Sequence, residues 1–165
     1  MDIEQEKIQR KVIFYASQAH KGQTRKFGAD KGKPYFDTHI SRVANAVINT
    51  NGTFDQVMAA WLHDLKEDQY EWWAEEVLLA MGISRDALDI VDSVTKREGE
   101  NYLQFTLRVI KNPEAILVKT MDITDNMSDL KEGSMKDKYR LARYLLDSES
   151  ASRNWVSWSQ KNGND

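Results

Sequence analysis

The sequence contains no cysteine, which limits both its redox chemistry and its choice of metal ligands. Without thiols the chain has no disulfide framework, no cysteine nucleophile and no sulfur ligand, so any bound metal must be held by nitrogen and oxygen. Proline and glycine are also scarce, with 2 and 8 residues among 165, which leaves little room for flexible linkers. The length suits one domain around a single core.

Long apolar runs and a basic excess are missing as well. The longest apolar run, at 57–62, is far too short to cross a bilayer. The N-terminal residues MDIEQEKIQR lack the apolar stretch of a signal peptide. The net charge of −3 does not favour nucleic acid as a partner. We therefore expect a cytoplasmic protein that binds neither nucleic acid nor a membrane, and the sequence leaves its oligomeric state open.

Apolar residues recur at helical spacing along most of the chain, and no segment shows the sustained alternation of a strand. This periodicity predicts a compact all-α domain of about eight helices. The expected helices cover 3–20, 37–49, 53–64, 72–81, 84–94, 102–110, 114–130 and 136–146. We expect residues 1–150 to form the domain and residues 151–165 to form a polar tail with two tryptophans that can make a short docking helix.

The most informative chemistry lies in the string WLHDLKED at 61–68. On a helix, His63 and Glu67 are four residues apart, as are Asp64 and Asp68, so each pair shares a side. Several carboxylates beside a buried segment are costly unless a cation offsets their charge. A solvated C-terminal turn is the simpler alternative, but three acids there oppose the helix dipole, which favours a functional site.

Two further residues on separate predicted helices extend this set. His39 lies early in the helix after the 21–36 loop, and a single histidine there is more often a satisfied core residue than a ligand. Asp122 follows the buried side of its helix, where it needs either a metal or a salt bridge with Lys119. Two imidazoles and two carboxylates together suit a divalent ion such as Mn²⁺, Fe²⁺, Co²⁺ or Zn²⁺.

The loop from Lys21 to Lys33 is strongly basic and directly precedes His39. A basic loop beside an acidic metal site is what a polyphosphate substrate requires, because the metal binds one phosphate and the cations bind the others. We expect Lys31 and Lys33 to be solvated. Lys21, Arg25 and Lys26 are the candidates for substrate contact, with the latter two preferred.

The strings AHKGQTRK, GKPYFDTHISRVA, AAWLHDLKED and VKTMDITDNM occur in an order that resembles the HD-type hydrolase domain of the RelA/SpoT alarmone enzymes, and most closely their small stand-alone relatives. The resemblance covers about residues 16–144. It implies an all-α HD fold, one divalent metal, usually Mn²⁺, and removal of the 3′-pyrophosphate from guanosine 3′,5′-bis(diphosphate) or a related alarmone. It also implies roles for particular residues: His39, His63, Asp64 and Asp122 as metal ligands, Glu67 and Asp68 as the acidic pair that activates water, and Arg25, Lys26 and Asn126 as substrate contacts, with the Arg25 guanidinium stacked on the base.

The sequence departs from this pattern at several positions. Leu65 and Lys66 follow the His-Asp pair where Val or Thr is usual, and Asp125 stands where many relatives have His or Tyr. These differences leave open a second hypothesis, an HD phosphohydrolase of another nucleotide such as a mono- or triphosphate. A third, a non-catalytic nucleotide-binding module, predicts loss of a ligand or of the acidic pair, and neither is lost.

Overall fold

Helix α3 (Phe54–Leu62) is the central element of the computed structural model, which describes residues 2–162 and the side chains of residues 2–154. Every residue from Gln56 to Leu62 is buried, as suits a helix surrounded by others. Four helices pack against it: α1 (Ile3–Ala19), α2 (Ser41–Asn49), α6 (Arg85–Val94) and α8 (Pro113–Asp129). Full burial of one Leu or Met side chain stabilises the fold by about 1.5–3 kcal/mol, so α3 contributes strongly to the core.

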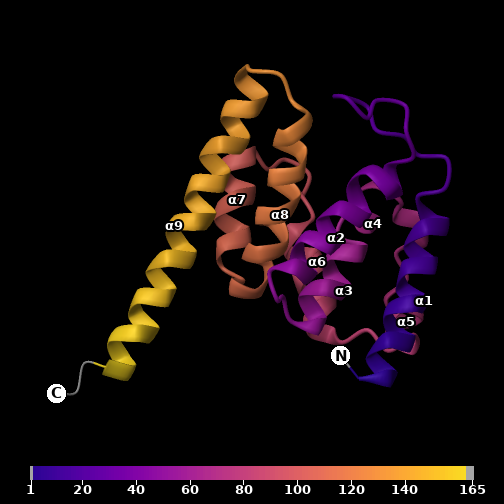
Figure 1. The fold of residues 1–165 in the computed structure, drawn as a ribbon, viewed down its shortest axis with the longest axis horizontal. Helices are drawn as coiled ribbons and strands as arrows, with labels where there is room; N and C mark the ends of the chain where they lie inside the picture. The colour runs from indigo at the N-terminus through magenta and orange to yellow at the C-terminus, as the bar shows by residue number, and fades with distance from the viewer. Residues whose placement is uncertain (1, 163–165) are drawn as a thin grey trace.

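The second half of the chain forms a layer of helices beside this centre. Helix α7 (Tyr102–Ile110) and the long α9 (Ser134–Asn162) pack together, and both contact α8. Figure 1 shows α9 along one side of the molecule and α1 with α5 (Glu75–Ala80) on the other. Helix α8 contacts α2, α3, α6, α7 and α9, so it joins the two halves.

The all-helical fold expected from the sequence is confirmed. Within residues 2–162 the only β-type pairing is an isolated antiparallel bridge between Thr24 and Pro34. Several helix starts follow local signals: Thr53 and Gln56 form a capping box, Ser84 caps α6, and Pro113 occupies the first turn of α8. No helix in these residues combines the length and apolarity needed to cross a membrane.

Four predicted helix boundaries differ from those in the structure. The helix predicted over 53–64 ends at Leu62, and a separate short helix, α4 (Leu65–Asp68), follows. The segment predicted as a regular helix from residue 37 begins with a wide π-helical turn (Phe36–Ile40) that carries His39, and the α-helix α2 follows from Ser41. The helix predicted from Trp72 begins instead at Glu75, because Tyr15 takes the Trp72 carbonyl as a hydrogen-bond acceptor at 2.5 Å.

The fourth difference is the length of the last helix. A stop was predicted after Leu146, but α9 continues without a break through residues 147–162. Polar side chains support this extension by pairing one turn apart, as between Arg153 and Glu149 at 2.7 Å. The segment from 151 to 162 therefore ends a long helix. Docking by its tryptophans, Trp155 and Trp158, concerns side chains outside the described set.

Candidate metal centre

Three separate segments bring two histidines and two aspartates to one point. His39 comes from the π-helical turn, His63 from the end of α3, Asp64 from the start of α4 and Asp122 from α8. The two imidazole Nε2 atoms lie 3.2 Å apart. The distance from His39 Nε2 is 3.4 Å to Asp64 Oδ2 and 3.3 Å to Asp122 Oδ1. The corresponding distances from His63 Nε2 are 3.3 and 3.9 Å.

Both imidazole rings are held so that Nε2 faces this point. The Nδ1–H of His63 donates to the Ala60 carbonyl at 2.8 Å, a bond that also accompanies the end of α3. The Nδ1–H of His39 donates to Asp125 Oδ2 at 2.6 Å. A neutral imidazole that donates through Nδ1 keeps its lone pair on Nε2, which is the form that binds a metal.

The two carboxylates are also oriented by neighbours. Tyr35 donates its hydroxyl to Asp64 Oδ2 at 2.6 Å. Asp122 accepts from Asn126 through Oδ1 and from Lys119 through Oδ2, both at 2.6 Å. The expected salt bridge with Lys119 is therefore made by Asp122 Oδ2, and the other oxygen, Oδ1, faces the imidazoles. Such neighbours fix the direction of the carboxylate lone pairs.

Buried charges dominate the electrostatics of the centre. Burial lowers the pKa of His39, but Asp122, Asp125 and Asp64 outweigh it and raise that pKa well above its usual value. Burial also lowers the pKa of His63, but the carboxylates, and Asp64 most of all, raise it above its usual value. Burial raises the pKa of Asp64 and Asp122, yet the neighbouring cationic groups lower both. The carboxylates therefore stay ionised and favour a cation between them.

The donor set fits one divalent ion. The ligand atoms of His39, His63 and Asp122 lie within 4.8 Å of one another, and Asp64 Oδ2 approaches both imidazoles from the same region. With metal–ligand distances of about 2.0–2.2 Å, neighbouring ligands of one ion lie about 3–3.5 Å apart, as most of these atoms do. Two nitrogens and two oxygens without sulfur are typical of Mn²⁺, Fe²⁺, Co²⁺ or Zn²⁺.

A cavity of about 580 Å³ opens above the centre. Asp64 and Asp122 lie in its wall, whereas His39 and His63 are buried at 0% and 3% exposure. Among the other residues predicted from the sequence, those that line the cavity are Arg25, Lys26, Glu67, Asp68 and Asn126. Lys21 is exposed and does not line it.

The acidic pair lies beside the ligands on α4. Asp68 Oδ2 accepts a hydrogen bond from Gln23 Nε2 at 2.7 Å. Glu67 Oε2 accepts from the Lys96 backbone N–H at 3.0 Å. Desolvation in the cavity wall raises the pKa of Glu67 above its usual value, against the effect of that bond. A carboxyl with a raised pKa is better suited to accept and release a proton near neutral pH.

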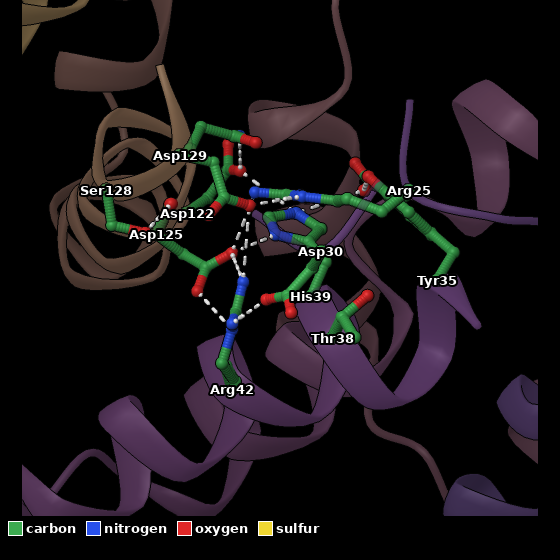
Figure 2. Close-up of polar contacts among 12 residues, drawn as sticks. Arg25, Asp30, Tyr35, Thr38, His39, Arg42, Asp122, Asp125, Ser128 and Asp129 are labelled. Carbon is green, nitrogen blue, oxygen red and sulfur yellow. Dashed lines mark hydrogen bonds and ion pairs between the residues drawn. The ribbon is translucent and has the colours of Figure 1, made fainter. Parts of the chain in front are cut away.

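Arg25 reaches the cavity but is engaged within the protein. Its side chain is 6% exposed, and it donates to Asp129 Oδ2 at 2.9 Å and to Asp125 Oδ2 at 3.2 Å. Figure 2 shows Arg25 directed toward these two carboxylates of α8. Stacking of the Arg25 guanidinium on a base therefore stays a prediction. Such stacking would use the flat face of the guanidinium and not the N–H groups that Asp125 and Asp129 already accept.

Sequence reasoning missed several residues that the fold brings to the cavity. Lys96, Lys119 and Lys138 supply positive charge from outside the 21–33 loop, and Tyr102 and Tyr139 form an aromatic wall with ring centroids 5.2 Å apart. For Lys119 the sequence predicts the salt bridge with Asp122 but not its place in the cavity wall. Lys96 and Lys138 carry no local signal, because only the packing of α7 and α9 brings them near the metal ligands.

Comparison with known proteins places this fold in context. No protein-family model matches the chain. A solved structure described as a metazoan ortholog of SpoT that hydrolyzes ppGpp aligns with a TM-score of 0.61 and 20% identity, over 88% of this chain and 84% of that one. The all-helical HD-domain fold expected from the sequence is therefore confirmed.

The sequence similarity is more specific than the fold. The chain is 28% identical over 149 residues to the bifunctional (p)ppGpp synthase/hydrolase SpoT of Escherichia coli K12. It is 30% identical over 142 residues to the guanosine-3′,5′-bis(diphosphate) 3′-pyrophosphohydrolase of Haemophilus influenzae. These alignments cover 84% and 80% of this chain but 20% of each relative, so the chain spans about a fifth of their length. The resemblance to RelA/SpoT-type enzymes is confirmed.

Proposed function

We propose that this protein is a metal-dependent hydrolase that removes the 3′-pyrophosphate from guanosine 3′,5′-bis(diphosphate) or a closely related alarmone, in the cytoplasm. The observation that carries the proposal is the meeting of two imidazole Nε2 atoms and two carboxylates beneath a cavity lined with lysines. The similarity to proteins named for this activity supports the choice of substrate.

His39, His63, Asp64 and Asp122 would hold one divalent ion, for which we propose Mn²⁺. When bound, the ion lowers the pKa of a coordinated water and polarises a phosphoryl oxygen. Asn126 and Lys119 keep Asp122 in position, and Tyr35 does the same for Asp64. Because both histidines donate through Nδ1, Nε2 is the nitrogen left to bind the ion, which would replace the proton that the neighbouring carboxylates favour there.

We assign proton transfer to the acidic pair on α4. Glu67 or Asp68 orients the attacking water and accepts its proton as the water oxygen bonds to the 3′-linked phosphorus. The bond between that phosphorus and the ribose 3′ oxygen breaks, and a proton passes to the 3′ oxygen. The products are the 5′-diphosphate nucleotide and pyrophosphate, so atoms and charge balance without an additional reactant.

The remaining parts of the substrate have partners in the cavity wall. The 5′-diphosphate carries charge that the metal cannot engage, and Lys26, Lys96 and Lys138 supply separate cations. Tyr102 and Tyr139 offer aromatic surface against which a purine base can pack. Arg25 and Asn126 complete the proposed contacts in the cavity wall, and Lys21, which lies outside the cavity, would reach only a part of the substrate that extends beyond it.

A phosphohydrolase acting on another nucleotide is the second candidate. The observation that favours it is that Arg25 donates to Asp125 and Asp129. These N–H groups are therefore not available for the predicted contact with an alarmone. Such an enzyme would use the same metal and acidic pair.

A nucleotide panel with product analysis separates these functions. Purified protein with Mn²⁺ is given guanosine and adenosine 3′,5′-bis(diphosphates) and plain mono-, di- and triphosphates, and the products are separated by anion exchange. We expect pyrophosphate and the 5′-diphosphate nucleotide in equal amounts, with much slower turnover of the plain nucleotides. Release of inorganic phosphate from a monophosphate, with the bis(diphosphates) intact, would contradict the alarmone assignment and support the second candidate.

A further inference from the structure

Asp125 lies next to the metal centre without facing it. It is on α8, one turn after Asp122, and its carboxylate is 11% exposed. Its Oδ2 accepts the Nδ1–H of His39 at 2.6 Å, whereas the metal-facing atom of that ring is Nε2. Asp125 therefore contacts the far side of a ligand and cannot bind the same ion through this oxygen.

Two arginines hold the Asp125 carboxylate in place. Arg42 donates from Nη2 to Asp125 Oδ2 at 3.4 Å and forms an ion pair through Nε, 2.7 Å from Oδ1, while Arg25 Nη2 donates to Oδ2 at 3.2 Å. Figure 2 shows the carboxylate between the His39 ring and the two guanidinium groups. Two guanidinium charges so close to the carboxylate favour its ionised form and restrain its position.

His39 has particular need of such a restraint. It lies in a π-helical turn rather than a regular helix, and its ring is buried. A neutral imidazole carries one N–H, and an acceptor at Nδ1 determines that the lone pair is on Nε2. A strong carboxylate acceptor also makes Nε2 a better donor to a metal.

We propose that Asp125 is a positioning residue for the metal centre: it sets the tautomer and the orientation of His39, and the clamp by Arg25 and Arg42 sets Asp125. The inference rests on the proposed metal function and assigns a role to a residue that stands where many RelA/SpoT-type relatives are expected to have His or Tyr. It also gives Arg25 a structural duty besides any contact with substrate.

Asp129 provides a matched control. It lies four residues after Asp125 on the same helix, is equally shielded at 9% exposure, and binds the same arginines, Arg25 at 2.9 Å and Arg42 at 3.5 Å. Among the described residues its carboxylate pairs with these two cations and not with His39. Asp129→Asn thus removes a second carboxylate that pairs with these arginines, while the contacts of Asp125 with His39, Arg25 and Arg42 are left in place.

The test is the Mn²⁺ affinity of the full chain, measured by calorimetry for the wild type, Asp125→Ala, Asp125→Asn and Asp129→Asn. Loss of such an outer partner typically weakens metal binding by about 10–100-fold, which we expect for Asp125→Ala. Asp125→Asn should recover most of the affinity, because its amide oxygen still accepts from Nδ1. Asp129→Asn should bind Mn²⁺ like the wild type.

A second readout covers the case in which Asp125→Ala does not fold. In Zn²⁺-loaded protein the Nδ1 proton of His39 should give a sharp, strongly downfield NMR signal that moves upfield in Asp125→Asn, because an amide is a weaker acceptor than a carboxylate. An unmoved signal, wild-type affinity in Asp125→Ala, or an equal loss in Asp129→Asn would overturn the inference. Failure of the wild type to bind any metal would instead overturn the proposed function and the inference together.

Discussion

At the scale of single residues, the side chains of the candidate centre differ in how firmly their neighbours hold them. His63 is held by a backbone carbonyl and Asp64 by a tyrosine hydroxyl, while the neighbouring Glu67 is bonded only through one oxygen to a backbone N–H. A residue with an oxygen left for water can take part in proton transfer, whereas a fully held residue contributes position. This difference leads to a direct test by substitution.

Glu67→Gln and Asp68→Asn should keep the bound metal and lose turnover. Neither side chain supplies a proposed ligand, and positioned acid–base groups contribute about 10²–10⁴-fold to a rate, so we expect kcat to fall in this range. The measurement is steady-state hydrolysis together with metal content for each variant. Loss of the metal with normal hydrolysis per bound ion would mean that the two carboxylates are ligands.

Three of the four proposed ligands carry a signal in the local sequence, whereas His39 taken singly is more typical of a core residue. His63 and Asp64 stand in a charged string after a buried helix, and Asp122 lies on the apolar side of its own helix. The role of Asp125 could not be predicted, because it depends on a contact with His39 across 86 residues. The same limit applies to Arg25, whose basic loop suggests a free cation until the fold pairs it with α8.

At the scale of elements, the loop before the π-helical turn packs closely against α8 beside the metal centre. Its Gly28 has φ +77°, and a Cβ there would lie 2.4 Å from the Cβ of Asp129. Gly32 has φ +84° with no atom within 4 Å of such a Cβ. The two glycines thus share the same backbone requirement but differ in their contact with α8.

Gly28→Ala and Gly32→Ala therefore make a matched pair. Left-handed backbone costs a non-glycine residue about 1–2 kcal/mol, so both variants should lose some stability in thermal unfolding. Only Gly28→Ala should also push the loop away from Asp129, which should raise KM and make the loop more susceptible to limited proteolysis. Equal KM values in the two variants would show that this contact does not position the substrate contacts of the loop.

A second element-scale prediction concerns the segment that leads into α7. Arg108 donates to Glu100 at 2.6 Å and to the carbonyls of Ser93 and Thr95, so it fixes the turn that presents Lys96 to the cavity. Its hydrogen bonds lower the pKa of Glu100 from 4.5 to about 2. A carboxyl whose pKa is lower in the folded protein than in the unfolded chain stabilises the fold at any pH above its unfolded-state pKa. This contribution is lost as the pH falls through the folded-state pKa.

The pH dependence of stability should follow that pKa shift. Glu100→Gln should unfold more easily than the wild type at neutral pH, because it removes the ion pair. The difference should shrink below about pH 4.5 and vanish below about pH 2, where Glu100 is protonated in both states. Chemical unfolding of both proteins across this range measures it, and a difference independent of pH would assign the loss to packing instead of charge.

Helix boundaries show the same division between local and distant causes. Starts marked by capping residues, such as those at Thr53, Ser84 and Asn101, agree with the sequence pattern. The break after Leu62 and the late start of α5 depend on hydrogen bonds from His63 and from Tyr15. Neither bond has a signature in the sequence around the boundary, so the pattern alone extends both helices too far.

At the scale of the whole molecule, the fold uses helix packing to bring charge into a small region. Helix α8 contacts both halves and carries Lys119, Asp122, Asp125 and Asp129 on turns that face the centre. Such a concentration of buried charge opposes folding unless it is compensated. A divalent ion that binds only the folded chain would shift the unfolding equilibrium toward the native state.

Metal binding by the purified full chain is thus the measurement that tests the account most directly. Elemental analysis after equilibration with Mn²⁺ should give about one ion per chain, and an excess of ion at about 100 times its Kd should stabilise the fold by about 2.7 kcal/mol. His39→Ala, Asp64→Ala and Asp122→Ala should each release the ion, because each removes a ligand. Full occupancy in all three variants, or no ion in the wild type, would contradict the assignment of this centre.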